Sequence, residues 1–259
     1  MNKREDSIRD FFKKNAESVI SVSDYYGNEK YEFIHNKIVY IFVIPKNPKN
    51  DEWIYRTEFF GAFDYADAKM VNDGYYLATA VISDLYGAPE AIALMDEFYR
   101  FMTYEFSLNK RTILFGFSRG GLYATNFATV YPERIKSIYL DAPVIDIASW
   151  PGGEGKGTCY TDEYADCKRL LHIENSYDMK QYQLELDRKL THLAELKIPI
   201  IIVYGDADEV VVFEENSLRL IEKLEKAGGS FKVIRKPNIG HHPHSLENPS
   251  EIVSFLEEN

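Results

Sequence analysis

The sequence predicts an α/β protein with a mostly parallel central sheet that is covered by helices on both faces. Strand-like and helix-like segments alternate along most of the chain, a pattern typical of right-handed strand–helix–strand crossovers. The run Ile198–Tyr204 is almost continuously apolar, as strands buried on both faces are. In addition, 259 residues, of which 45% are hydrophobic, suffice for one large core. We therefore predict a single domain over residues 1–259.

The first half of the chain is predicted to open with an antiparallel hairpin. Residues 31–44 are rich in β-branched and aromatic residues, and Asn36 and Lys37 supply the polar turn between two strands. Gly61 ends the next predicted strand, and helical spacing follows it. The elements predicted after the hairpin are strands at 53–60, 75–82, 112–117 and 135–140 and helices at 62–71, 88–106 and 120–131.

The second half repeats the alternation after an interruption. The segment from about 146 to 196 breaks the rhythm, because Trp150–Gly157 favours a loop and the helices after it are charged and weakly periodic. This insertion is too short to be a second domain, so we expect it to lie over the strand ends as a lid. The remaining predicted elements are strands at 198–204 and 231–235 and helices at 213–227 and 251–256.

Composition and charge exclude several classes of partner. The 30 basic and 41 acidic residues give a net charge of −11, which should repel a nucleic-acid backbone. The N-terminus lacks the apolar core of a signal peptide and no run is long enough to span a membrane, so we expect a cytoplasmic protein with no membrane partner. Cys159 and Cys167 lie eight residues apart, which suits neither a redox pair nor a zinc knuckle, and we expect plain thiols.

The motif with the clearest chemical meaning is Gly116–Gly120, which fits G-x-S-x-G with Ser118 at its centre. A predicted strand precedes it and a predicted helix follows, the context in which a tight turn exposes a serine hydroxyl. Such a turn is strained, and glycines two residues before and after the serine leave room for its backbone. Ser118 is therefore the predicted nucleophile.

A serine hydroxyl becomes a good nucleophile only when a neighbouring base removes its proton, so a histidine and an acid should follow in the chain. The loop after the strand at 198–204 contains Asp206 and Asp208. The loop after the last predicted strand contains His241, His242 and His244. The order serine, acid, histidine, each after a strand, is one of the known orders of a hydrolase triad.

Five motifs together carry a resemblance to a known family. They are WIYRTEFFGAF (53–63), GFSRGGLY (116–123), DAPVIDIASWPGG (141–153), GDADEVV (205–211) and GHHPHSL (240–246). From about residue 30 onward the chain resembles the α/β-hydrolases of the esterase and prolyl-oligopeptidase-like branch. The resemblance implies the α/β-hydrolase fold. It also points to Asp208, which lies in the family's Gly-x-x-Asp-x-x-Val pattern, and to His241, because the family's histidine most often follows a glycine directly.

The same architecture implies two backbone donors for a developing oxyanion. One is the N–H of the residue after the nucleophile, here Arg119. The other comes from the loop after the strand at 53–60, where Phe60 and Gly61 replace the family's usual His-Gly pair. This departure leaves Phe60, Gly61 and Ala62 as alternatives for the second donor.

Several side chains on the same loops are candidate substrate contacts. Arg56 could bind an anionic or hydroxylated group, or pair with loop carboxylates. Tyr86 and Trp150 could line the substrate pocket, or pack under the insertion. His242 is the fourth candidate, and it is also the alternative to His241 as the base.

The other titratable residues near these motifs have structural interpretations. One spare histidine, His242 or His244, is expected to order its loop through a ring N–H while the other lies on the surface. A zinc site built from His-His-Pro-His lacks a matching acid or cysteine nearby in the sequence, so we predict no metal and no cofactor. Asp141 is expected to make local hydrogen bonds in its turn.

These residues predict a serine hydrolase that cleaves a small carboxylic ester, such as an acylated sugar or an ester of a plant-derived acid, through an acyl-enzyme. A peptidase or acyl-peptide hydrolase is the alternative, and it would need a carboxylate for the substrate amino group, for which Glu58 is a candidate. A catalytically silent binding module is a third alternative, against which the intact Ser118, Asp208 and His241 speak. The oligomeric state and the acyl and alcohol parts stay open.

Overall fold

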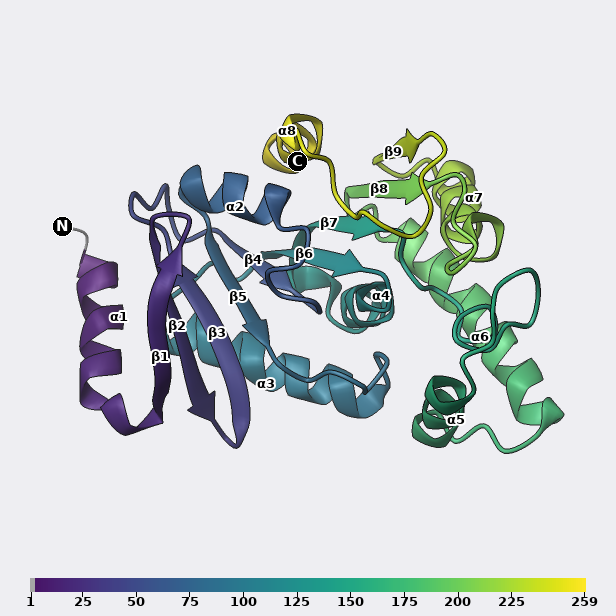
Figure 1. Cartoon of the computed structure of the whole chain (residues 1–259), viewed down its shortest axis with the longest axis horizontal. Coiled ribbons are helices and arrows are strands. Elements are labelled where there is room, and N and C mark those ends of the chain that lie inside the picture. The colour runs from purple at the N-terminus through teal and green to yellow at the C-terminus, as the bar shows by residue number, and fades with distance from the viewer. Residues whose placement is uncertain (1–2) are drawn as a thin grey trace.

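Residues 3–259, the part of the chain that the computed structural model describes, form nine strands and eight α-helices (Figure 1). Residues 1 and 2 of the predicted domain lie outside this part. The strands are β1 (Val19–Tyr25), β2 (Asn28–His35), β3 (Ile38–Ile44), β4 (Trp53–Arg56), β5 (Tyr76–Ala80), β6 (Thr112–Phe117), β7 (Ile135–Asp141), β8 (Ile200–Gly205) and β9 (Phe231–Lys236). The helices are α1 (Lys3–Lys14), α2 (Tyr65–Asn72), α3 (Pro89–Glu105), α4 (Gly120–Val130), α5 (Thr161–Leu170), α6 (Ser176–Glu195), α7 (Ser217–Ala227) and α8 (Ser250–Glu258).

All nine strands form one sheet with the order β1-β2-β3-β5-β4-β6-β7-β8-β9. The pairs β1–β2, β2–β3 and β3–β5 are antiparallel, and every other neighbouring pair is parallel. The predicted mostly parallel sheet is thus confirmed, and the antiparallel hairpin at its beginning is also present. Because β4, β6, β7, β8 and β9 run in the same direction, the loops after them meet at one edge of the sheet.

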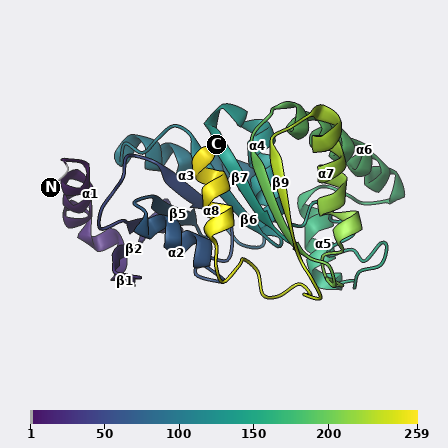
Figure 2. The same cartoon turned by 90° about the horizontal axis from the view of Figure 1, so that it is seen from above.

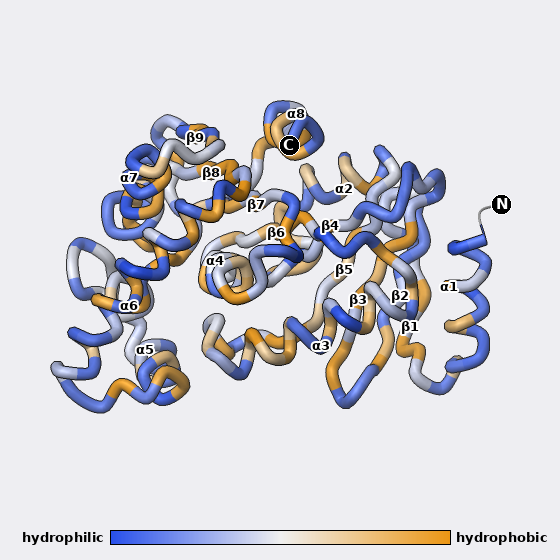
Figure 3. Tube along the Cα trace, turned by 180° about the vertical axis from the view of Figure 1, so that it is seen from behind, coloured by the Kyte–Doolittle hydropathy of each residue, from blue (hydrophilic) through white to orange (hydrophobic). Residues whose placement is uncertain are grey.

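Helices cover both faces of the sheet (Figure 2), and β8 is largely hydrophobic in the hydropathy colouring of Figure 3. The strand side chains alternate between two cores. Ile200 and Ile202 of β8 belong to the core that also contains buried side chains of α3, α4, α6 and α7. Ile201 and Val203 of the same strand pack with α2 and α8 on the opposite face. This alternation explains why the sequence of β8 is almost continuously apolar, because neither set of side chains reaches solvent.

One predicted strand is shorter in the structure, and two observed elements were not predicted. The strand predicted over 53–60 ends at Arg56, because Phe59 and Gly61 have φ values of +54° and +81° and turn the chain away from the sheet. β1 and α1 have no counterpart among the predicted elements. β1 is mostly exposed at the sheet edge, so it lacks the buried apolar alternation that identifies a strand.

The insertion predicted as a lid has two structurally different parts. Leu186, Leu190 and Leu193 of α6 are buried in the main core, where α6 packs beside α4 and α7. This helix is therefore the crossover between β7 and β8, and it belongs to the layer that covers the sheet. Only the preceding part, which includes α5, is left to lie over the strand ends, so the lid-like segment is shorter than the predicted 146–196.

Two expectations about the surface and the thiols can also be compared with the structure. None of the helices within residues 3–259 is long and apolar enough to cross a membrane. Cys159 is exposed, Cys167 is buried, and both are free thiols as predicted.

Candidate active site

The turn between β6 and α4 holds Ser118 in a strained backbone conformation. Its φ is +48°, a value that costs a residue with a side chain roughly 1–2 kcal/mol. Backbone hydrogen bonds from Ser118 N–H to Asp141 O (3.0 Å) and from Val144 N–H to Ser118 O (2.8 Å) hold the turn. A Cβ on Gly116 would lie 2.8 Å from Gly120 O, so the glycines of the motif are required by close backbone approach.

The structure brings Ser118, His241 and Asp208 into one hydrogen-bonded row. Ser118 Oγ lies 2.9 Å from His241 Nε2, and His241 Nδ1 lies 2.8 Å from Asp208 Oδ2. The other carboxylate oxygen, Oδ1, accepts the backbone N–H groups of Val210 and Val211 at 2.9 Å each. An ionised carboxylate accepts the Nδ1–H, which leaves the Nε2 lone pair facing the serine hydroxyl.

Close contact between two loops places the acid and the histidine side by side. A Cβ on Gly205 would lie 2.3 Å from Ile239 O and 2.4 Å from Gly240 O, so only glycine allows the loop after β9 to approach the end of β8 this closely. Asp206 joins the same two loops, since its Oδ1 accepts the N–H of Asn238 at 2.6 Å. Asp206 therefore braces the loops, and Asp208 is the carboxylate that contacts the histidine.

A second histidine–carboxylate pair lies behind this row. His244 Nδ1 is 2.9 Å from Asp141 Oδ1, and both side chains are buried. Asp141 Oδ2 also accepts Tyr139 O–H at 2.7 Å and Ser245 N–H at 2.8 Å, and Lys236 Nζ lies 3.6 Å from Oδ1. Burial alone would raise the pKa of Asp141, but the hydrogen bond and the charge of the His244 ring hold that pKa below its usual value. His244 thus orders the histidine loop, whereas His242 is exposed.

The backbone N–H groups near Ser118 Oγ supply candidate oxyanion donors. Among residues 3–259, no group accepts the N–H of Arg119, which stands at the start of α4. Ala62 is removed from the alternatives, because its N–H donates to Phe59 O at 3.0 Å. Within the described part of the chain the N–H groups of Phe59, Phe60 and Gly61 have no such partner. Phe59 lines the pocket and joins the predicted candidates.

Arg56 has the carboxylate-pairing role that the sequence offered as the alternative to substrate contact, although it also lines the pocket. Its side chain is fully buried and forms an ion pair with Asp67 at 2.9 Å. Its other donors reach the backbone oxygens of Glu58 (2.8 Å) and Ala62 (2.9 Å), and its guanidinium lies 3.5 Å from the centre of the Phe117 ring. Arg56 therefore holds the loop after β4 in place, and its donors are already occupied.

Tyr86 and Glu58 also have structural partners. Tyr86 is buried, with its ring centre 6.4 Å from that of Trp150, and it does not line the pocket, so it has the packing role that the sequence offered as the alternative to substrate binding. Burial raises the pKa of Tyr86 to about 12. Glu58 is buried and pairs with Arg119, which also contacts Asp84 at 2.7 Å. The carboxylate of Glu58, which the sequence suggested for a substrate amino group, is therefore paired with Arg119.

A pocket of about 340 Å³ opens beside Ser118 and His241. Trp150 and His242 line it, as do Tyr160 and Glu163 of the inserted segment, which have no recognisable spacing in the sequence. Its wall is mainly aromatic, a composition typical of sites for small organic ligands. The remaining lining residues are Arg56, Phe59, Ala62, Phe63, Phe117, Val210 and His244.

Known proteins share this architecture. A family model described as the prolyl oligopeptidase family matches residues 94–258, and no curated protein sequence matches the chain. Among solved structures, a protein described as a dipeptidyl aminopeptidase IV from Bacteroides ovatus is 17% identical with a TM-score of 0.64, over 93% of this chain and 36% of that one. An S-formylglutathione hydrolase from Agrobacterium tumefaciens is 15% identical with a TM-score of 0.62, over 93% and 96%. A puromycin hydrolase is 15% identical with a TM-score of 0.65, over 90% and 38%.

The chain thus spans little more than a third of two of these proteins and nearly all of the other. At such low identities the likeness concerns the fold, and it confirms the predicted α/β-hydrolase fold.

Proposed function

Because the chain belongs to the prolyl oligopeptidase family, whose members are serine hydrolases, we propose that it hydrolyses a small carboxylic ester through an acyl-enzyme intermediate. The observation that carries this proposal is the hydrogen-bonded row of Ser118, His241 and Asp208 beside an aromatic-lined pocket. We also propose that residues 1–259 function as a single domain, with Ser118 as the nucleophile.

Acylation would begin when Ser118 Oγ attacks the ester carbonyl carbon while His241 Nε2 accepts the hydroxyl proton. Collapse of the tetrahedral intermediate breaks the carbon–oxygen bond to the alcohol, and His241 returns the proton to that leaving oxygen. A water molecule then attacks the acyl group on Ser118 with the same histidine as base, which releases the acid. Asp208 keeps the imidazole in the required tautomer and stabilises its charged form.

The negative charge of each tetrahedral intermediate would be stabilised by the N–H of Arg119 and by an N–H from Phe59, Phe60 or Gly61. Removing one such donor typically costs about 2.7–4 kcal/mol of transition-state stabilisation. The ion pair of Arg119 with Glu58 joins the two segments that carry these donors, and Asp84 adds a second partner for Arg119. We propose that this pairing keeps the donors in position before substrate arrives.

Glu58, the carboxylate that the sequence suggested for a substrate amino group, is not available for that role. An enzyme that binds a free amino group needs a carboxylate in its pocket, and Glu58 is buried against Arg119. Glu163 does line the pocket, and it is the observation that favours a second candidate, an aminoacyl substrate with a free amino group. The solved puromycin hydrolase and dipeptidyl aminopeptidase give this second candidate a precedent within the fold.

The proposal is tested by initial rates with the acetate, butyrate and octanoate esters of p-nitrophenol, with the native chain and Ser118→Ala at matched concentration. We expect turnover of the short esters that is lost in Ser118→Ala, since the pocket is small and the serine is the nucleophile. Equal rates for the two proteins would refute the serine mechanism.

An aminoacyl p-nitroanilide, with its amino group free or acetylated, separates the two candidates. Cleavage of only the free amine, weakened by Glu163→Gln, would favour the aminoacyl substrate. No turnover of any ester or anilide would leave the binding-module alternative.

A further inference from the structure

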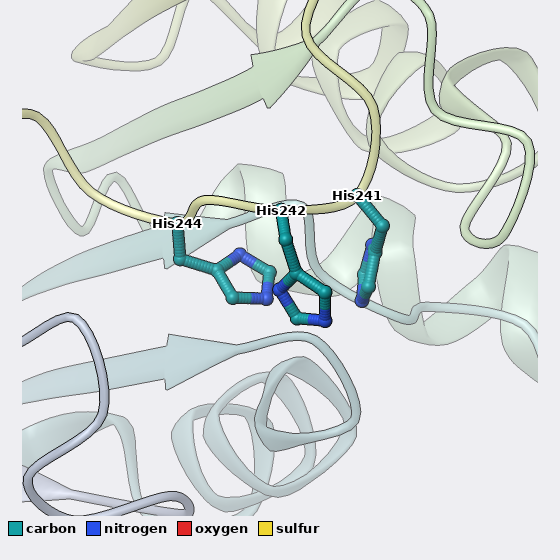
Figure 4. Close-up of side chains that lie close together, drawn as sticks. All are labelled: His241, His242 and His244. Atoms are coloured by element: carbon teal, nitrogen blue, oxygen red, sulfur yellow. The ribbon is translucent and has the colours of Figure 1, made fainter.

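Three histidine rings lie around a common centre at the edge of the pocket (Figure 4). The ring centres of His241 and His242 are 4.9 Å apart, those of His241 and His244 are 4.8 Å apart, and those of His242 and His244 are 4.9 Å apart. One nitrogen from each ring lies within 4.8 Å of the others. Figure 4 shows that the three side chains extend from one short loop toward the same side. The three nearly equal distances make the ring centres an almost equilateral triangle.

Two of these rings already have the orientation of metal-binding histidines. The Nδ1 atoms of His241 and His244 face Asp208 Oδ2 and Asp141 Oδ1, at 2.8 and 2.9 Å. Metal-binding histidines commonly donate one ring N–H to a carboxylate, which fixes the tautomer and makes the other nitrogen more basic. Both carboxylates are remote from the loop in the sequence, and the fold supplies them from the ends of β7 and β8.

The third ring is free to adjust. His242 is exposed, and within residues 3–259 no hydrogen bond is formed by its ring, which stacks on Phe63 with 5.4 Å between ring centres. In a tetrahedral zinc site, Zn–N bonds of about 2.0–2.1 Å place the ligand nitrogens about 3.4 Å apart. The ligand nitrogens lie within 4.8 Å of one another, so the three rings would have to move closer by about an ångström to bind zinc, and the exposed His242 ring is the one with no hydrogen bond to break within residues 3–259.

The local charge also suits a cation. The ammonium of Lys236 lies 3.6 Å from Asp141, but the carboxylates of Asp141 and Asp208 outnumber it. Glu163 adds a third carboxylate in the pocket lining. The fourth coordination position would face the pocket, where water can occupy it.

We propose that His241, His242 and His244 form a binding site for a divalent transition-metal ion, principally zinc. The bound ion reversibly inhibits the enzyme. Coordination uses the His241 Nε2 lone pair, the one that must accept the Ser118 proton during catalysis. The inhibitory part of this inference rests on the proposed function, whereas metal binding does not.

Binding is measured first, on the Ser118→Ala protein, so that hydrolysis plays no part. Isothermal titration with ZnCl₂ should give one site per chain. Titration with CoCl₂ should give the visible absorption bands of tetrahedral cobalt coordination. His242→Ala in the same background should weaken zinc binding at least about tenfold, a typical loss for one ligand or its partner. His192→Ala, which removes an exposed histidine on α6, is the matched control and should bind zinc as before.

The site is refuted if zinc fails to bind, or if His242→Ala and His192→Ala have the same affinity, which would indicate adventitious surface binding. His242 is exposed, so its variant should fold normally, and circular dichroism checks this. Inhibition is then tested on the native chain with a p-nitrophenyl ester. Zinc should abolish turnover and a chelator should restore it. Unchanged turnover at a zinc concentration that saturates the site would refute inhibition alone, and a chain that hydrolyses nothing would refute the proposed function while the binding result stands.

Discussion

Replacing Asp208 by asparagine should nearly abolish activity, and the structure specifies why. Oδ1 of Asp208 accepts two backbone N–H groups, and Oδ2 faces His241 Nδ1. In Asp208→Asn the amide oxygen would stay with the two N–H donors, and the NH₂ group would face the imidazole. The ring would then take the tautomer with its proton on Nε2, which cannot accept the proton of Ser118.

The magnitude follows from the cost of turning the amide over. A flipped amide would place its NH₂ group opposite the N–H groups of Val210 and Val211. Each N–H donor left without an acceptor costs about 1–3 kcal/mol. At least about 2 kcal/mol leaves the flipped form below about 4% of the population. Loss of the charge that stabilises the imidazolium reduces the rate further. We therefore expect kcat to fall about 10⁴-fold, equivalent to about 5.4 kcal/mol.

The assay is kcat for a p-nitrophenyl ester, with thermal unfolding to show that the variant is folded. Asp206→Asn is the matched control. Asp206 braces the loop through Asn238 and lies 3.5 Å from Arg235, contacts of a kind that contribute little near the surface, so activity should stay within about fivefold. The reasoning is refuted if Asp208→Asn keeps more than about a tenth of the native kcat, or if both variants lose activity equally.

Three further predictions concern the turn and the thiols. Ser118→Gly should unfold about 2–4 °C above Ser118→Ala, because glycine relieves about 1 kcal/mol of strain at φ +48°, and equal melting temperatures would contradict this. Gly116→Ala should lower the free energy of unfolding, measured by urea titration, by about 1–3 kcal/mol, because its Cβ would lie 2.9 Å from the Cβ of Ala124. Unchanged stability would show that the turn can accommodate a Cβ at this position. At pH 8 iodoacetamide should modify Cys159 within minutes and spare Cys167, whose pKa burial raises to about 12, until urea exposes it. Mass spectrometry of the folded protein distinguishes the two, and equal modification would show that the buried thiol is accessible.

The features predicted well are those that depend on neighbours in the chain. The turn around Ser118 requires glycine at position 116, because a Cβ there would lie 2.8 Å from Gly120 O in the same motif. The apolar run of β8 reports burial on both faces of the sheet. Helix α6 was harder to place, because its many charged residues obscure the spacing of its three buried leucines. Only its packing against α4 and α7 shows that it belongs to the core.

Side-chain roles near the site depended on partners that are remote in the sequence. Arg56 could be either a substrate contact or a structural residue until the fold placed Asp67 and the carbonyl oxygens of its own loop around it. Tyr86 was equally open, and it became a buried residue because the inserted segment covers it. Neither outcome follows from spacing, because each depends on which surfaces the chain brings together.

The sequence by itself determined the α/β class, the strained turn that presents Ser118, and the order of serine, acid and histidine along the chain. These are local properties, since backbone sterics and the burial of single strands restrict the residue types at each position. The family pattern in the sequence already favoured Asp208 and His241, but only the tertiary structure shows their contact. Only the tertiary structure also shows that Asp206 braces the loops and that Asp141 orients His244. Hydrogen bonds between residues from different strand ends form only after the sheet has set those ends side by side, whereas the spacing of residues along the chain does not reveal them.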